Sequence, residues 1–303
     1  MASKLRAKKP DSNIQLSKPK VLVYGRPGVG KTWCALDFDS CYFIDSEGGA
    51  NQKHYLDKIS ASGGAYMGQQ DGAQDYETVI EQVKALATEK HQYKTLIIDS
   101  ISHLQLLEIG KEVEKMMKSN KDMTKTYGAE KKPSIAYSKR LFDWLSRLDM
   151  TVILIAHEKQ RYENDVAAGF TADAWDKLEH LLNLTLRIKK QGDSRLAFVQ
   201  KSRFEGFPTD ETIPWSYEEF AKRYGKKILQ TESKPEILAS DEQVTRINDL
   251  LEVVRLDEGA TQKWLEAAGA ETWAEMPSDK LAKCITLLES KLPKTTTPTT
   301  KGE

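Results

Sequence analysis

Apolar and polar positions follow two different regimes along the chain. In its first half, four short runs are continuously apolar and rich in β-branched residues: 20–25 (KVLVYG), 41–46 (CYFIDS), 95–100 (TLIIDS) and 151–156 (TVILIA). Segments between them, such as 76–89, repeat apolar residues every three or four positions, as amphipathic helices do. Continuously apolar strands separated by helices predict an α/β fold whose central sheet is mostly parallel and covered by helices.

Two later patterns add to this core. The polar segment 191–194 (QGDS) separates two strand-like runs, which predicts a β-hairpin added to the sheet. From Ser240 onward the apolar spacing is helical, Ser240 and Gln243 have the spacing of a capping box, and Gly269 stands where a helix would stop. We expect a small C-terminal all-α domain of three helices.

The same patterns predict how the chain is divided. Segments at both ends are poor in apolar residues and cannot bury enough surface to offset the entropy of ordering. We expect five parts: a basic disordered segment at 1–18, the α/β core at 19–231, a linker at 232–240, an acidic helical domain at 241–292 and a disordered tail at 293–303.

Composition and charge narrow the class of protein. The longest apolar runs are too short to cross a bilayer, and none follows the basic N-terminus as in a signal peptide, so we expect a cytoplasmic protein without a membrane partner. Cys34, Cys41 and Cys284 lack the spacing of a disulfide framework or a zinc site. The formal net charge of zero conceals a basic start and an acidic end, which predicts different partners for the two.

The first predicted strand runs directly into GRPGVGKT at 25–32, which fits the phosphate-loop pattern GxxxxGK[ST] without a mismatch. Its glycines let backbone N–H groups curl around an anion. Lys31 supplies positive charge to the β- and γ-phosphates, and the Thr32 hydroxyl is a ligand for Mg²⁺. The pattern predicts an ATP site with these nucleotide-binding residues: Gly25, Arg26, Pro27, Gly28, Val29, Gly30, Lys31, Thr32 and Trp33.

Two carboxylates follow neighbouring apolar runs. Asp99 ends one run, and because the carboxyl ends of parallel strands meet at one edge, we predict it beside the phosphate loop as a Mg²⁺ ligand. In many ATP hydrolases a glutamate follows this aspartate and activates the attacking water, but here Ser100 follows. Glu47, after another run, is the candidate base because it would reach the same edge. A solvent-exposed turn acid is the alternative interpretation of Glu47.

The motifs GRPGVGKT, IDSEGG, IIDSISHL, ILIAHEKQ and VQKSRFEGF, in this order, resemble RecA-type ATPases rather than the AAA+ type, whose metal aspartate is followed directly by glutamate. More narrowly they resemble the phage-encoded RecA-like P-loop ATPases of single-strand annealing and recombination, the Sak-type proteins. The resemblance covers about residues 20–208. It implies a RecA-like P-loop NTPase core and a Mg²⁺-ATP-dependent ATPase that binds single-stranded DNA in phage recombination.

The resemblance also implies residue roles. It gives the phosphate, metal and base roles to the residues already named: Lys31, Thr32, Asp99 and Glu47. His157, at the end of 151–156, would stand where such proteins place a γ-phosphate sensor; a structural hydrogen-bonding role is its alternative. Lys201 and Arg203 match a basic pair that reaches into the neighbouring subunit's ATP site, which implies a homo-oligomer with ATP at its interfaces.

Two long polar stretches, 118–134 and 157–175, mix basic with aromatic residues. Basic side chains that track a phosphate backbone, together with rings on which bases stack, are what sequence-tolerant single-strand binding requires. Plain surface loops are the alternative interpretation. Taken with the resemblance, these stretches predict contacts with single-stranded DNA from the following residues: Lys121, Lys125, Tyr127, Lys131, Lys132, Lys159, Arg161, Tyr162 and Phe170.

Other assignments stay open from the sequence. The chain shows no counterpart of the N-terminal docking helix and strand of RecA, which leaves filament formation open. Its acidic helical end resembles the helical tails of phage recombination proteins and favours contact with a single-strand binding protein or another recombination protein. A replication ATPase of the helicase or helicase-loader type shares the phosphate loop and Asp99. A small-molecule kinase needs an arginine-rich lid, which Arg161 alone does not supply.

Overall fold

The computed structural model describes residues 17–119, 128–164 and 166–292. The chain divides into two compact units, each assembled from separate stretches of sequence. The first unit draws on residues 1–71, 92–103 and 149–233, and the second on residues 72–91, 104–148 and 234–303. The predicted helical end therefore belongs to the same unit as helices from the middle of the chain.

The first unit is built on one sheet, whose order within the described residues is β3-β2-β4-β5-β1-β7-β8-β9, with β6 paired to β5. The strands from β3 to β7 pair in parallel, and β7, β8 and β9 pair antiparallel. This confirms the predicted α/β core with a mostly parallel sheet. The strands are β1 (Lys20–Gly25), β2 (Cys41–Asp45), β3 (Ala65–Met67), β4 (Thr95–Asp99), β5 (Thr151–Glu163), β6 (Val166–Ala172), β7 (Leu184–Gln191), β8 (Ser194–Ser202) and β9 (Thr212–Pro214).

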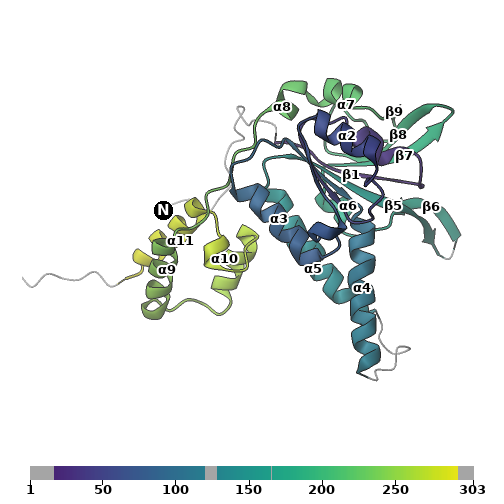
Figure 1. Ribbon diagram of the computed structural model, residues 1–303. Helices are drawn as coiled ribbons and strands as arrows, with labels where there is room; N and C mark the ends of the chain where they lie inside the picture. The colour runs from purple at the N-terminus through teal and green to yellow at the C-terminus, as the bar shows by residue number, and fades with distance from the viewer. Residues whose placement is uncertain (1–16, 120–127, 165, 293–303) are drawn as a thin grey trace, which may run out of the picture. The chain divides into compact units, whose positions relative to one another are not determined.

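Helices of the first unit pack on one face of this sheet (Figure 1). They are α1 (Lys31–Ala35), α2 (Lys53–Ala61), α7 (Tyr217–Tyr224) and α8 (Lys226–Gln230), whereas α6 (Leu178–Leu181) contributes no described residue to their apolar cluster. Alternate strand residues, such as Val21 and Val23 of β1, turn to the same apolar cluster as Phe220 of α7. Full burial of an apolar side chain of this size stabilises the fold by roughly 1.5–3 kcal/mol, so this face anchors the strands whose ends carry the site.

The strand register brings the chemistry to one edge. Asp45 of β2 lies opposite Asp99 of β4, and Gly25 of β1 lies opposite His157 of β5. All four residues stand at or near the carboxyl ends of parallel strands, where the phosphate loop begins. The sheet therefore places the predicted ATP-site residues side by side, as expected for a crevice at this edge.

Two hairpins extend from this edge in the same direction (Figure 1). The β7–β8 hairpin turns at residues 192–193, which confirms the prediction made from QGDS. The β5–β6 hairpin corrects the prediction of a long loop at 157–175, because β5 continues through residue 163 and β6 returns alongside it. A bulge interrupts this pairing between Gln160 and Tyr162. The apolar run that predicted β5 covers only its buried first half.

The second unit is helical. It contains α3 (Tyr76–Thr88), most of α4 (Ile101–Lys118), α5 (Lys132–Arg147), α9 (Asp241–Val253), α10 (Ala260–Ala268) and α11 (Ser278–Glu289). Ser240 and Gln243 form the predicted capping box, and α10 ends at Gly269 with a φ of 65° in the left-handed region. The three helices of the C-terminal region surround their own apolar cluster. Both findings confirm the predicted C-terminal helical region.

Ion pairs tie this helical region to α3 and α5 within the second unit. Arg147 donates to the Glu236 carboxylate at 2.6 Å, and Lys84 donates to Glu275 at 3.0 Å. Arg140 also pairs with Glu275. The acidic charge of the helical end is thus partly matched by basic residues of the same unit. None of the helices in the described part of the chain is long and apolar enough to cross a membrane.

Candidate nucleotide site

The phosphate loop joins β1 to α1 and curls as the glycine pattern predicts. Gly28 and Gly30 have φ angles of 75° and 89°, which favour glycine. The Lys31 ammonium lies across the loop and donates to the carbonyls of Gly25 at 2.8 Å and Arg26 at 3.0 Å. Burial lowers the pKa of Lys31, against the raising influence of Asp99 and Glu47. The loop thus holds a cation at the mouth of an anion-binding turn.

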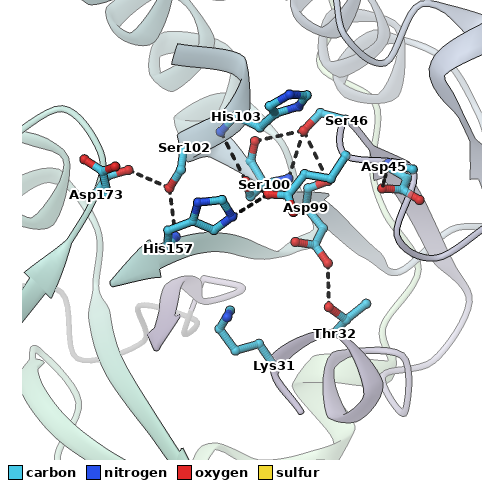
Figure 2. Close-up of polar contacts among 12 residues, drawn as sticks. Lys31, Thr32, Asp45, Ser46, Asp99, Ser100, Ser102, His103, His157 and Asp173 are labelled. Carbon is cyan, nitrogen blue, oxygen red and sulfur yellow. Dashed lines mark hydrogen bonds and ion pairs between the residues drawn. The ribbon is translucent and has the colours of Figure 1, made fainter. Parts of the chain in front are cut away.

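Thr32 and Asp99 meet as the sequence predicts for a magnesium site (Figure 2). The Thr32 hydroxyl donates to Oδ2 of Asp99 at 2.6 Å. Removal of the Asp99 carboxylate from water raises its pKa to about 6 despite this hydrogen bond. No cluster of three or more His, Cys, Asp or Glu side chains in the described residues could hold a metal ion. A hydroxyl and one carboxylate suit Mg²⁺ that takes its other ligands from phosphate and water.

Glu47 lies at the same edge and has two polar partners. Its Oε1 accepts a hydrogen bond from the Ser100 hydroxyl and lies 2.6 Å from Nε2 of His157. The peptide bond between Asp99 and Ser100 is cis. Three neighbouring strand ends therefore supply a carboxylate, a hydroxyl and an imidazole within hydrogen-bonding distance of one another. The structure thus places the Glu47 carboxylate at the edge that carries the phosphate loop, and its role as the base stays a prediction.

The turn that carries Glu47 is stabilised by the buried carboxylate of Asp45. Asp45 accepts hydrogen bonds from the backbone N–H groups of Gly48 at 2.8 Å and Ala50 at 2.9 Å, and from the Tyr66 hydroxyl at 3.0 Å. These three donors on one carboxylate brace the turn after β2. Asp45 stands in the sequence only as the end of a predicted strand, whereas its contacts make it the residue that holds the Glu47 turn in place.

His157 is positioned through its backbone. The Ser102 hydroxyl accepts a hydrogen bond from the His157 N–H at 2.8 Å and donates one to the Asp173 carbonyl at 2.5 Å (Figure 2). In addition, the Asp173 N–H donates to the His157 carbonyl at 2.8 Å. The start of α4 and the end of β6 thereby fix the backbone from which the imidazole reaches Glu47. The β5–β6 hairpin is connected to the ATP site at this point.

The phosphate loop lies between two cavities. One, of about 350 Å³, is lined by the acidic side chains of Asp45, Glu47 and Asp99 and by His157. The other, of about 360 Å³, has a rim of aromatic and basic side chains: Trp33, His54, Tyr55 and Arg195. Trp33 was predicted from its place after Thr32. His54, Tyr55 and Arg195 were missed, because no local spacing relates α2 or β8 to the loop.

The basic pair lies at the end of β8, with Lys201 on the strand and Arg203 directly after it. Lys201 donates to the carbonyls of Glu179 and, at 2.8 Å, of Leu182. Arg203 donates to the His180 carbonyl at 2.7 Å. The three carbonyls belong to α6 and the residue that follows it. Within this chain the pair caps α6, and its role in a neighbouring subunit stays a prediction.

The predicted DNA contacts fall in different places. Lys121, Lys125 and Tyr127 lie outside the described residues, and Lys131 and Lys132 are exposed where α5 begins. On the β5–β6 hairpin, Arg161 and Tyr162 are exposed, the latter at 62%. Lys159 is half-buried, and its Nζ lies 3.5 Å from Oδ1 of Asp173. The Phe170 ring lies under the Arg187 guanidinium at 4.2 Å, so one of its faces is already occupied.

A phosphate loop, a hydrogen bond between Thr32 at its end and Asp99 of β4, and a mostly parallel central sheet define a P-loop ATPase. The chain belongs to the family described as an AAA domain, which matches residues 17–239. Membership implies ATP as the nucleotide. Glu47, the predicted base, lies in the turn after β2, whereas Ser100 follows Asp99.

Among solved structures, the chain is similar to the crystal structure of the RadB recombinase, with 17% identity over 65% of this chain and 87% of that one and a TM-score of 0.41. It is also similar to the flagellar accessory protein FlaH from Methanocaldococcus jannaschii, with 13% identity over 65% and 84% of the two chains and a TM-score of 0.34. These scores carry no argument about function. No curated protein matches the chain.

Proposed function

We propose that this protein is a Mg²⁺-ATP-dependent ATPase that binds single-stranded DNA and acts in phage DNA recombination by single-strand annealing. The observation that carries the proposal is the position of Glu47, which lies on a separate strand end from Asp99 and is paired with His157 and Ser100. This separation of metal acid and base is the feature on which the resemblance to RecA-type recombination ATPases rests.

The geometry supports separate roles for the residues of the site during ATP hydrolysis. Lys31 would hold the β- and γ-phosphates, while Thr32 and Asp99 would hold Mg²⁺, which neutralises charge that develops on the transferred phosphoryl group. Glu47 would take a proton from the attacking water, because its carboxylate lines the same cavity as Lys31. His157, whose Nε2 lies 2.6 Å from Oε1 of Glu47, would contact the γ-phosphate. Loss of that contact on hydrolysis would then shift the backbone of β5.

The β5–β6 hairpin supports the DNA-binding part of the proposal. Arg161 and Tyr162 are exposed on it, and its base begins at His157. A cation for phosphate and a ring for base stacking on one projecting element suit a single strand. Because the hairpin starts at the ATP site, DNA bound there would be coupled to hydrolysis through the His157–Glu47 contact.

Assembly completes the proposal. We infer that Lys201 and Arg203, which contact the α6 region within this chain, would serve a neighbouring subunit's ATP in the assembly. Added positive charge there would stabilise the transferring phosphoryl group. The proposed active form is a homo-oligomer with ATP between subunits, and the helical C-terminal region is the proposed contact for another recombination protein.

The proposal is tested by following complementary fluorescent oligonucleotides with the full-length protein, Mg²⁺ and ATP. We expect the single strands to anneal several-fold faster than without protein, while a tailed duplex stays intact. Unwinding of the tailed duplex would instead favour a replication helicase. Phosphorylation of a nucleoside, with no effect on either DNA substrate, would favour a small-molecule kinase.

A further inference from the structure

Arg195 crosses the phosphate loop at Gly30, over the space that a side chain at that position would occupy. A Cβ atom added to Gly30 would overlap Nε and Cδ of the Arg195 side chain. Arg195 is the second residue of β8, and its carbonyl accepts from the Trp215 N–H at 2.8 Å. The backbone at the base of the arginine is therefore fixed by the sheet, while its side chain lies on the loop.

One donor of the Arg195 guanidinium is left without a partner. Its Nε is buried and has no hydrogen-bond partner among the described residues. A buried donor without a partner costs folding free energy, because it has lost its hydrogen bonds to water and gained none in the protein. Such a donor beside an anion-binding loop is explained if a ligand supplies the missing acceptor.

The cavity at Arg195 has the charge that such a ligand needs. It measures about 360 Å³, and the described residues that line it include the cations Lys31 and Arg195 but no carboxylate. The opposite cavity holds Asp45, Glu47 and Asp99 instead. Magnesium, the γ-phosphate and the attacking water belong on the acidic side, so the nucleoside and its adjoining phosphate belong on the side of Arg195.

We propose that Arg195 binds, within its own subunit, the phosphate of the nucleotide that is nearest to the nucleoside. This inference rests on the proposed ATPase function and adds a nucleotide-binding residue to it. The guanidinium offers several N–H donors in one plane, which suits the oxygens of a phosphate group. Gly30 has a φ of 89°, which favours glycine, and its lack of a side chain leaves the present path of Arg195 open.

Arg195, near the start of β8, differs in its proposed role from the basic pair Lys201 and Arg203 at the end of that strand. Lys201 and Arg203 contact carbonyls of the α6 region and are proposed to act on a neighbour's γ-phosphate. Arg195 lies on its own loop and on the nucleoside side. Loss of Arg195 should therefore weaken ATP and ADP equally, whereas loss of a γ-phosphate contact would weaken ATP alone.

The test is equilibrium binding of ATP and of ADP to the full chain with Mg²⁺, measured by calorimetry. Because a charge-assisted hydrogen bond contributes about 1.5–3 kcal/mol, we expect Arg195→Ala to weaken both nucleotides by about 10- to 100-fold. Arg195→Lys should lose less than the alanine variant. Lys190→Ala is the matched control, since Lys190 lies opposite Arg195 in the β7–β8 register and is exposed. It should bind both nucleotides as the native protein does.

Steady-state kinetics separates binding from a merely structural role. Arg195→Ala should raise KM for ATP and leave kcat within roughly threefold, since the residue does not contact the reacting phosphate. Mixing it with Lys31→Ala subunits should not restore its affinity, because the contact is within one subunit. Should Arg195→Ala fail to fold, the weakened binding of Arg195→Lys carries the test.

The possible failures are distinguishable. If the native protein does not bind ATP, or if Lys31→Ala binds it equally well, the proposed ATPase site is wrong. If the native protein binds and Arg195 variants bind both nucleotides unchanged, only the role of Arg195 is overturned. A loss confined to ATP would also overturn it, because the contact would then be to the γ-phosphate.

Discussion

Glu47 owes its position to long-range contacts rather than to its own turn. Asp45 braces the backbone of the turn through the N–H groups of Gly48 and Ala50, and the partners of the carboxylate, Ser100 and His157, come from two other strand ends. Each partner follows a strand whose apolar run was evident in the sequence. The predicted proximity of Glu47 and Asp99 therefore followed from the parallel sheet, whereas the pairing of Glu47 with His157 was not predicted, because the resemblance implied only a γ-phosphate sensor at His157.

We expect Glu47→Gln to bind ATP within about threefold of the native protein but to hydrolyse it at least 100-fold more slowly, since general-base catalysis contributes about 10²–10⁴-fold. Glutamine keeps an acceptor for Ser100 but cannot take the proton. Calorimetry and a phosphate-release assay measure the two effects. Glu252→Gln, an exposed change on α9, is the control. Near-native turnover in Glu47→Gln would remove Glu47 as the base.

The raised pKa of Asp99 predicts a conflict between stability and function. Its pKa of about 6 exceeds the ordinary value of 3.8, so the folded chain binds the proton more tightly than the unfolded chain. The stabilisation by that proton is complete below about pH 4 and is lost as pH rises through 6. Above pH 6 the folded protein therefore bears an unfavourable carboxylate when no Mg²⁺ is bound.

Asp99→Asn should remove this cost. With EDTA at pH 7.5, we expect the variant to melt roughly 2–6 °C above the native protein, and the gap to narrow as pH falls from 6 to 4. Mg²⁺-dependent ATP hydrolysis should be lost in the same variant. Thermal melting followed by circular dichroism measures the stability. A lower melting temperature at pH 7.5 would show that the carboxylate stabilises the metal-free fold.

Local signals predicted those elements whose residues are buried on regular faces. The continuous runs of β1 and β4, the capping box at Ser240 and the turn after Gln191 each depend on nearby residues alone. The outer half of β5 and all of β6 escaped prediction, because they project beyond the core and mix polar residues with small ones. Arg195 escaped for another reason: its contact with Gly30 arises from the pairing of β7 with β1, which no spacing encodes.

The β5–β6 hairpin is the element on which DNA binding is tested. We expect Arg161→Ala combined with Tyr162→Ala to reduce the stimulation of ATPase activity by single-stranded DNA by at least tenfold, because a stacked base alone contributes about 1–3 kcal/mol. The rate without DNA should stay within twofold, since neither side chain lines the acidic cavity at the phosphate loop. Lys222→Ala, an exposed change on α7, is the control. Unchanged stimulation would place the DNA elsewhere.

The proposed role of Lys201 and Arg203 can be tested only in the assembled protein. In a head-to-tail assembly, each site would combine one subunit's phosphate loop with the next subunit's Lys201 and Arg203. The double variant Lys201→Ala/Arg203→Ala and the variant Lys31→Ala should each be inactive. An equal mixture should regain roughly a quarter of the native activity, since one interface in four joins an intact loop to an intact pair. No recovery at any ratio would count against a shared site.

One experiment decides between a DNA-dependent ATPase and a P-loop protein of another kind. It measures the rate of ATP hydrolysis by the full chain in Mg²⁺ as an oligo(dT) single strand is added, with a blunt duplex and a mixture of nucleosides as comparisons. We predict that the single strand raises the rate at least fivefold, in line with the hairpin's link to the Glu47 site, and that neither comparison does so. A rate that does not respond to single-stranded DNA at any concentration would contradict the account.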